Sequence, residues 1–225
     1  MPRPTLLAVS HGTSDAAGAA SIDALVTAVA AALPDVRVRA AFVDVQQPDA
    51  VSALAATPGP TVVVPLLLSR GFHVHHDLHG MIRERTDAVV TAPLGPDALL
   101  AEVLADRLTG LRHPDSPVIL AVAGSRDETS VQDAEGMASL LRARTGHEVT
   151  LAYLAARQPD LPTALATHPD AVVATYLLAQ GFFFDLTVRQ AAGRATTPPL
   201  LDDGAVPQPL VHLVVGRYEG AAARL

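Results

Sequence analysis

The sequence predicts an α/β protein made of two similar halves. Each half is expected to be a doubly wound parallel sheet with flavodoxin-like topology, and the two halves face each other across a cleft. Two observations predict this class. Short apolar runs alternate with helical patterns, which is typical of parallel sheets covered by helices on both faces. The same series of motifs then occurs a second time, and such a repeat determines the architecture.

In the first half, each expected strand ends at a loop or a proline-containing segment. Residues 5–10 (TLLAVS) form a short apolar strand that ends at His11, and Ser14 or Asp15 can cap the alanine-rich helix that follows. The hard stop Pro58-Gly59-Pro60 precedes the third strand. The other elements expected in this half are strands at 36–45, 61–68 and 87–92, short helices before 56 and at 81–85, and a helix at 97–108.

The second half repeats these motifs. The segment SHGT corresponds to VAGS, FVDVQQP to YLAARQP, and PLLLSRGFH to TYLLAQGFF. Strands are therefore expected at 118–122, 148–154 and 171–178, and a helix capped by Asp127 runs to about residue 145. Prolines in the segment 111–117 mark the hinge, so we expect one domain at 1–112 and another at 116–225.

Composition excludes several classes of function. With 225 residues, 49% of them hydrophobic and only 17% charged, the chain can bury a large core. The absence of cysteine excludes disulfides, thiolate metal sites and cysteine nucleophiles. A net charge of −7 argues against nucleic acid or an anionic membrane as a partner. No apolar run approaches the roughly 18 residues of a membrane span, and no export signal is visible, so a cytoplasmic protein is expected.

Histidines are concentrated after the third strand. Residues 65–80 read PLLLSRGFHVHHDLHG and contain His73, His75, His76 and His79. Neutral imidazole binds borderline divalent metals and accepts protons near neutral pH. The carboxyl end of a buried strand is also where open α/β sheets place their ligands. This segment is therefore a candidate metal site, with His75, His76 and His79 as weaker candidates for which solvent exposure is the better explanation.

Comparison of the two halves isolates three positions. His11 corresponds to Ala123, Asp44 to Ala155, and His73 to Phe183, while the flanking motifs stay matched. If these polar residues served the fold alone, the second half would need them too.

These three residues follow or end the first, second and third strands. In a doubly wound sheet the first strand lies between the other two, so all three carboxyl ends open onto one crevice. Two imidazoles and a carboxylate suit Fe²⁺, Co²⁺, Ni²⁺ or Zn²⁺. For Asp44 there is an alternative role, which is to hydrogen-bond the following loop.

These residues resemble the sirohydrochlorin chelatase family, the class II tetrapyrrole chelatases of cobalamin and siroheme synthesis. The similar motifs are the early HG, the acidic residue in VDVQQP, and VVVPLLLSRGFHVHHD, and the resemblance extends through the terminal LVHLVVGRY segment. It implies a chelatase-like fold with His11 and His73 as catalytic metal ligands. Asp44 takes the position of a third ligand that is commonly glutamate in the family.

The resemblance also implies an activity. The protein would insert Co²⁺ or Fe²⁺, with Ni²⁺ as a further candidate, into sirohydrochlorin, with histidines as metal ligands and proton acceptors. The metal would be a substrate, and no organic cofactor is implied. Because relatives with one repeat pair as homodimers, a chain with two repeats is expected to be a monomer.

The macrocycle carries eight carboxylates, so local cationic or N–H groups are expected around it. Candidates are Arg70, Arg126 and Arg189 on loops, and Gly124 with Ser125 at a helix N-terminus.

Two other classes of function share some of these features. A carrier that binds the metal or the tetrapyrrole without turnover fits the same residues. A histidine phosphatase also has an early HG, but it requires an arginine directly before the histidine, where this chain has Ser10.

Overall fold

The computed structural model describes residues 3–70, 78–83, 85–111 and 116–225. The first sheet has the parallel strand order β2-β1-β3-β4, so the first strand lies between the second and third as predicted. Its strands are β1 (Thr5–Ser10), β2 (Val38–Phe42), β3 (Thr61–Pro65) and β4 (Ala88–Val90). The helices of this half are α1 (Ala16–Ala32), α2 (Ala50–Ala55), α3 (His79–Met81) and α4 (Ala98–Leu108).

The second sheet repeats this topology with the parallel order β6-β5-β7. Where the first sheet has β4, the described residues of the second half provide only an isolated bridge between Val173 and Thr196. The strands are β5 (Val118–Val122), β6 (Val149–Tyr153) and β7 (Val172–Tyr176). The helices are α5 (Glu128–Thr145), α6 (Leu161–Thr167), α7 (Phe182–Ala191) and α8 (Gln208–Ala222). The predicted fold class is confirmed.

Alternate residues of the central strands are buried on opposite faces of each sheet. In β1, Leu6 and Ala8 belong to the largest apolar cluster, whereas Leu7 and Val9 belong to a second one under α2. Strand β5 divides in the same way between the largest cluster and a third one under α6 and α7. Because side chains in a strand alternate between its two faces, a strand that is apolar throughout requires cover on both faces.

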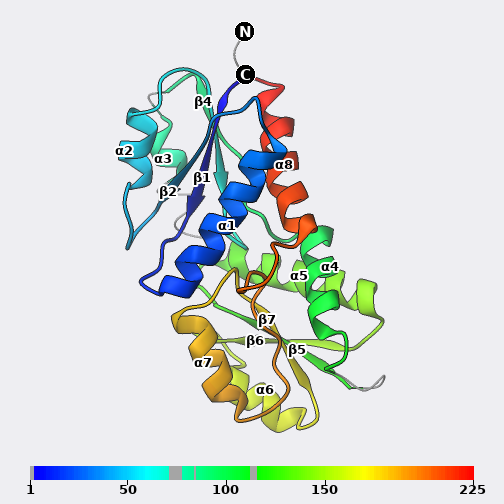
Figure 1. The fold of residues 1–225 in the computed structure, drawn as a ribbon. Helices are drawn as coiled ribbons and strands as arrows, with labels where there is room; N and C mark the ends of the chain where they lie inside the picture. The colour runs from blue at the N-terminus through cyan, green and yellow to red at the C-terminus, as the bar shows by residue number, and fades with distance from the viewer. Residues whose placement is uncertain (1–2, 71–77, 84, 112–115) are drawn as a thin grey trace.

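Two helices each pack against elements of the other half and so hold the halves together. Helix α4 packs on α5 and β7 of the second half, and the terminal helix α8 packs on α1, α4 and β3 of the first. Figure 1 shows α8 beside α1, with α4 and α5 between the two sheets. The expected boundary near 112–116 follows the repeat in the sequence, but these two helices pack across it.

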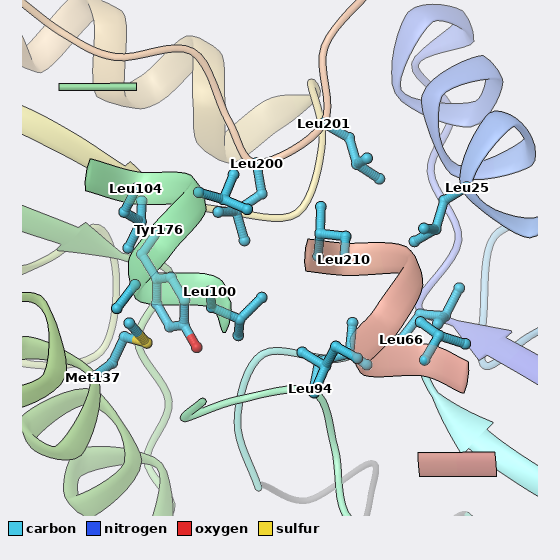
Figure 2. Packing of buried hydrophobic residues seen from close by; sticks show 14 of the residues in the cluster. Leu25, Leu66, Leu94, Leu100, Leu104, Met137, Tyr176, Leu200, Leu201 and Leu210 are labelled. Carbon is cyan, nitrogen blue, oxygen red and sulfur yellow. The ribbon is translucent and has the colours of Figure 1, made fainter. Parts of the chain in front are cut away.

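The junction is filled by a single apolar cluster to which both halves contribute. Leu100 and Leu104 of α4 lie beside Tyr176 of β7 and Met137 of α5, and Leu25 of α1 and Leu210 of α8 lie farther along the same cluster (Figure 2). Its largest fully buried members include Leu25, Leu66, Leu100 and Leu104. Burial of a leucine side chain contributes about 1.5–3 kcal/mol, so this shared core holds the halves together.

Several details differ from the sequence prediction. Strands β1 and β5 have the predicted bounds, whereas the other strands end earlier than expected. The helix predicted at 81–85 lies instead at His79–Met81, and it is followed by hydrogen bonds from Arg83 N to Gly80 O and from Arg85 N to Ile82 O. Helices α6 and α7 were not predicted. Asp15 and Asp127 cap α1 and α5 as expected. In the part of the chain that the structure describes, no helix is both long and apolar enough to cross a membrane.

Candidate functional site at the junction of the halves

A cavity of about 680 Å³ lies between the carboxyl ends of the strands of the two sheets. From the first half it is lined by the segments that follow β1 and β3, including His11 and Arg70. From the second half it is lined by the segments that follow β5 and β7, including Gly124, Ser125 and the start of α7. The volume is within the usual range for sites that bind small organic ligands.

His11 and Asp44 lie on neighbouring loops that are packed backbone to backbone. The Asp44 N–H donates to the carbonyl of His11 at 2.9 Å. Gly12 between them has φ +92°, and a Cβ at this position would collide with the carbonyl oxygen of Asp44. The glycine of the HG motif is thus required by the close approach of two loops, and this approach brings the two candidate ligands together.

The side chains of the pair differ in their surroundings. His11 is exposed and lines the cavity, with Nδ1 3.4 Å from the carbonyl oxygen of Gly12. Asp44 is exposed beside the cavity rather than in its lining, and its Oδ1 accepts a hydrogen bond from the Val45 N–H at 2.8 Å. This hydrogen bond matches the alternative role foreseen for Asp44, while direct metal ligation stays a prediction.

The second half has the same loop frame, which is a pair of hydrogen-bonded loops with a glycine where they approach most closely, but without the polar side chains. The Ala155 N–H donates to the carbonyl of Ala123 at 3.0 Å, and Gly124 has φ +88°. A Cβ at Gly124 would collide with the carbonyl oxygen of Ala155. The frame is therefore independent of His11 and Asp44, which supports a function for these two residues beyond the fold.

Two side chains that were not predicted from the sequence hold these loops together by hydrogen bonds. Gln46 Oε1 accepts from the Thr13 N–H at 2.9 Å. At the corresponding position of the repeat, Arg157 donates to the carbonyls of Ser125 at 2.8 Å and Arg126 at 2.6 Å. The signal was present in the paired motifs VQQP and ARQP, where the residue before Gln-Pro carries a long polar side chain in both halves.

Arg70 lines the cavity and is also held by the second half. Its backbone N–H donates to Asp133 Oδ2 at 2.6 Å, and its guanidinium donates to Oδ1 from Nε at 3.0 Å and Nη2 at 2.7 Å. Asp133, on α5, is only 3% exposed. Its hydrogen bonds and charge raise the pKa of Arg70. Arg70 is thus fixed in place, with part of its charge already balanced.

The other predicted substrate contacts divide into two groups. Gly124 and Ser125 are in the cavity lining, whereas Arg126 and Arg189 are not. The Asp127 carboxylate accepts from the Thr129 N–H at 2.9 Å and so occupies the N-terminus of α5. An anion at that helix end would lie close to this carboxylate.

A buried tyrosine in the cavity lining joins the halves. The Tyr176 hydroxyl donates to the carbonyl of Leu68 at 3.0 Å, and burial raises the pKa of Tyr176 well above its ordinary value. Gly95 lies so close that a Cβ there would collide with this hydroxyl. The contact fixes the segment that follows β3 against the second sheet.

Among the described residues, no three histidine, aspartate or glutamate side chains are gathered closely enough to hold a metal ion. His73, His75 and His76 lie outside the described residues. The ligand role of His73 therefore stays a prediction.

The chain belongs to the CbiX family, whose profile matches residues 5–111 and again residues 117–214. The family resemblance and the repeat inferred from the sequence are both confirmed. A curated relative, the sirohydrochlorin ferrochelatase of Priestia megaterium, is 29% identical over 138 residues, which is 55% of this chain and 52% of the relative. The chain thus spans about half the length of the curated relative that it matches.

Two solved structures share the fold over nearly the whole chain. SirB from Bacillus subtilis with Fe³⁺ has a TM-score of 0.83 at 19% identity, with 99% of this chain and 96% of that chain covered. The sirohydrochlorin chelatase SirB from Bacillus subtilis subspecies spizizenii, in complex with cobalt, has a TM-score of 0.81 at 18% identity, with the same coverage. At these identities the likeness establishes the fold.

Proposed function

We propose that this protein inserts a divalent metal, Co²⁺ or Fe²⁺, into sirohydrochlorin. The observation that carries the proposal is the asymmetry of the repeat at the cavity. Both halves have the same loop frame, but only the first places an imidazole and a carboxylate, His11 and Asp44, on it. Membership of the CbiX family and the names of the matched relatives support the same reaction.

The reaction requires two pyrrole protons to leave while the metal exchanges its water ligands for ring nitrogens. His11, exposed at the cavity, can ligate the metal or accept a proton when its imidazole is neutral. A metal held by few protein ligands keeps coordination positions available for the macrocycle, whereas a closed four-ligand site would retain it. His73 is proposed as the second histidine and Asp44 as a further ligand.

The carboxylates of the macrocycle need polar partners at the rim of the cavity. Arg70 and the backbone N–H groups around Gly124 and Ser125 are proposed for this role, together with Arg126 on the adjacent loop. Because Asp133 already balances part of the charge of Arg70, we expect Arg70 to orient the substrate more than to attract it.

A carrier that binds metal or tetrapyrrole without turnover is the second candidate function. The two are separated by incubating a catalytic amount of protein with sirohydrochlorin and Co²⁺, Fe²⁺ or Ni²⁺ in parallel and following the absorbance of the metallated product. A chelatase forms many equivalents of product per protein. A carrier forms at most one equivalent above the uncatalysed background, and that result would reject the proposed function.

A further inference from the structure

Two of the large apolar side chains that remain exposed in the described part of the chain line the cavity, one from each half. Val45, in the loop after β2, is 57% exposed, and Phe182, at the start of α7, is 69% exposed. A single exposed apolar residue needs no explanation. Two that converge on one cavity, whose lining also includes Ile22, Leu66 and Leu178, indicate an apolar ligand surface.

Phe182 is exposed but held in place. Its ring lies edge-to-face against Phe183, with ring centroids 5.4 Å apart and an interplanar angle of 73°. Phe183 is partly buried against the apolar core under α6 and α7. An aromatic ring supported in this way loses little conformational freedom when a ligand covers it.

Val45 has an unfavourable backbone conformation for its side chain. Its φ is 63°, in the left-handed region that β-branched residues rarely adopt. The corresponding residue of the repeat, Ala156, has φ 64° and does not line the cavity. The turn can therefore be made with a smaller side chain, so the turn itself does not account for the valine.

We propose that Val45 and Phe182 are substrate-contacting residues that pack against the apolar faces of the tetrapyrrole ring. This inference rests on the proposed function. The ring is flat and conjugated, and its charged groups are confined to its rim, so an aromatic ring and a branched aliphatic group match its faces while the rim meets polar groups. These two residues would then determine selection for a flat macrocycle over a smaller carboxylate ligand.

The test is a titration of metal-free sirohydrochlorin, followed by absorbance, together with insertion kinetics for Co²⁺. Phe182→Ala is expected to raise Kd and KM about tenfold with a much smaller change in kcat, and Val45→Ala to raise both about threefold. Phe182→Tyr keeps the ring and should stay within about twofold of the native chain. Phe182→Leu, which keeps an apolar side chain, should weaken binding several-fold and replaces the alanine variant if that variant does not fold.

Two matched controls separate contact from a general loss of surface apolarity. The controls are Val188→Ala and Val51→Ala. Val188 is on the same helix and is 50% exposed, Val51 is on α2 and is 61% exposed, and neither residue lines the cavity. Both should leave Kd and KM unchanged. Native-like Kd in folded Phe182→Ala or Phe182→Leu would overturn the inference while leaving the chelatase proposal intact. Failure of the native chain to bind sirohydrochlorin would overturn both.

Discussion

At the scale of single residues, Gly12 determines whether His11 and Asp44 can be neighbours. Its φ of +92° and the closeness of the Asp44 carbonyl leave no room for a side chain. The second half also requires a glycine, at Gly124. The requirement for glycine therefore comes from the loop frame and does not depend on His11 or Asp44. A glycine after the histidine is therefore required by the backbone, whatever the role of His11.

Gly12→Ala tests this account of the loop. The substitution combines a left-handed backbone with a collision against the backbone of Asp44, so we expect a loss of about 2–4 kcal/mol in unfolding free energy, measured by urea denaturation. Gly59→Ala is the matched control, since Gly59 has φ +77° and no neighbouring atom near a Cβ. It should cost only about 1–2 kcal/mol. Equal losses for the two variants would show that the close approach is not what selects glycine.

At the residue level, the repeat in the sequence predicted that His11 and Asp44 meet at one edge of the sheet, and their role as ligands stays a prediction. His11 and Asp44 follow adjacent strands, and their loops do lie together. The partner of Arg70 could not be predicted, because Asp133 is 63 residues away on a helix of the other half. Helical spacing identifies which residues share a helix face, but it does not identify the loop of another half that the face meets.

At the scale of elements, the contact between α5 and the segment after β3 is a buried polar link between the halves. Asp133 accepts from both the backbone and the guanidinium of Arg70, and it is almost completely buried. Removing one partner of such a group leaves the other without its hydrogen bonds. This link therefore holds the start of the histidine-containing segment 70–79 against the second half.

Asp133→Asn keeps the shape of the side chain but removes its charge. We expect the unfolding free energy to fall by about 1–3 kcal/mol, measured as a lower urea midpoint with an unchanged slope. Glu135→Gln, exposed on the same helix, is the control and should have little effect. A midpoint for Asp133→Asn equal to that of Glu135→Gln would mean that the ion pair adds nothing to stability.

Capping residues identified two helices correctly, but α6, which Asp160 caps, and α7 were not predicted. Asp15 and Asp127 marked α1 and α5 correctly. Helix α7 begins at Phe182, after Gly181, which has no side chain that could cap the helix. Its first three residues are Phe-Phe-Phe, which favour strands. Burial of Phe183 and Phe184 against the second-half core outweighs that local preference.

At the scale of the whole molecule, the halves are joined by helices that cross between them. The sequence predicted two halves from the repeat, but it could not predict that α4 packs on α5 and β7 or that α8 packs on the first half. The apolar stripe of a helix shows that it is buried, without showing against which sheet. Because α4 and α8 each pack on the other half, both halves contribute side chains to the shared core (Figure 2).

The shared core leads us to expect a monomer. Both halves already bury their facing surfaces against each other, so no second copy is needed to complete the junction. Sedimentation at micromolar concentration should give a mass near the 23.3 kDa of one chain. A mass twice that value at the same concentration would contradict the expectation.

Acid should weaken the junction through Asp202. Burial disfavours its charged form, but hydrogen bonds from Arg107 and from the Gly204 N–H, together with the charge of Arg107, outweigh this, so the pKa of Asp202 lies below its ordinary value. The unfolded chain therefore binds the proton first as pH falls. The stability that the pair provides is complete above about pH 4 and is lost as pH falls through the folded pKa.

Asp202→Asn tests this linkage by urea unfolding at pH 7 and at successively lower pH. The variant should be less stable than the native chain by about 1–3 kcal/mol at pH 7, with the difference shrinking below about pH 4. Glu219→Gln, which removes an exposed pair with Arg3 at 3.7 Å, is the control and should change little. A difference between Asp202→Asn and the native chain that stays constant to pH 3 would contradict the assignment.

We propose that His11, at the cavity between the halves, takes part in metal insertion. The most direct measurement is the steady-state rate of Co²⁺ insertion into sirohydrochlorin by the native chain, His11→Ala and His212→Ala, with folding checked by circular dichroism. His212 is exposed on α8 and lies outside the cavity lining, so its variant should match the native rate. His11→Ala should remain folded and lose about 100-fold or more in kcat/KM. A folded His11→Ala variant with native kcat/KM would contradict the claim.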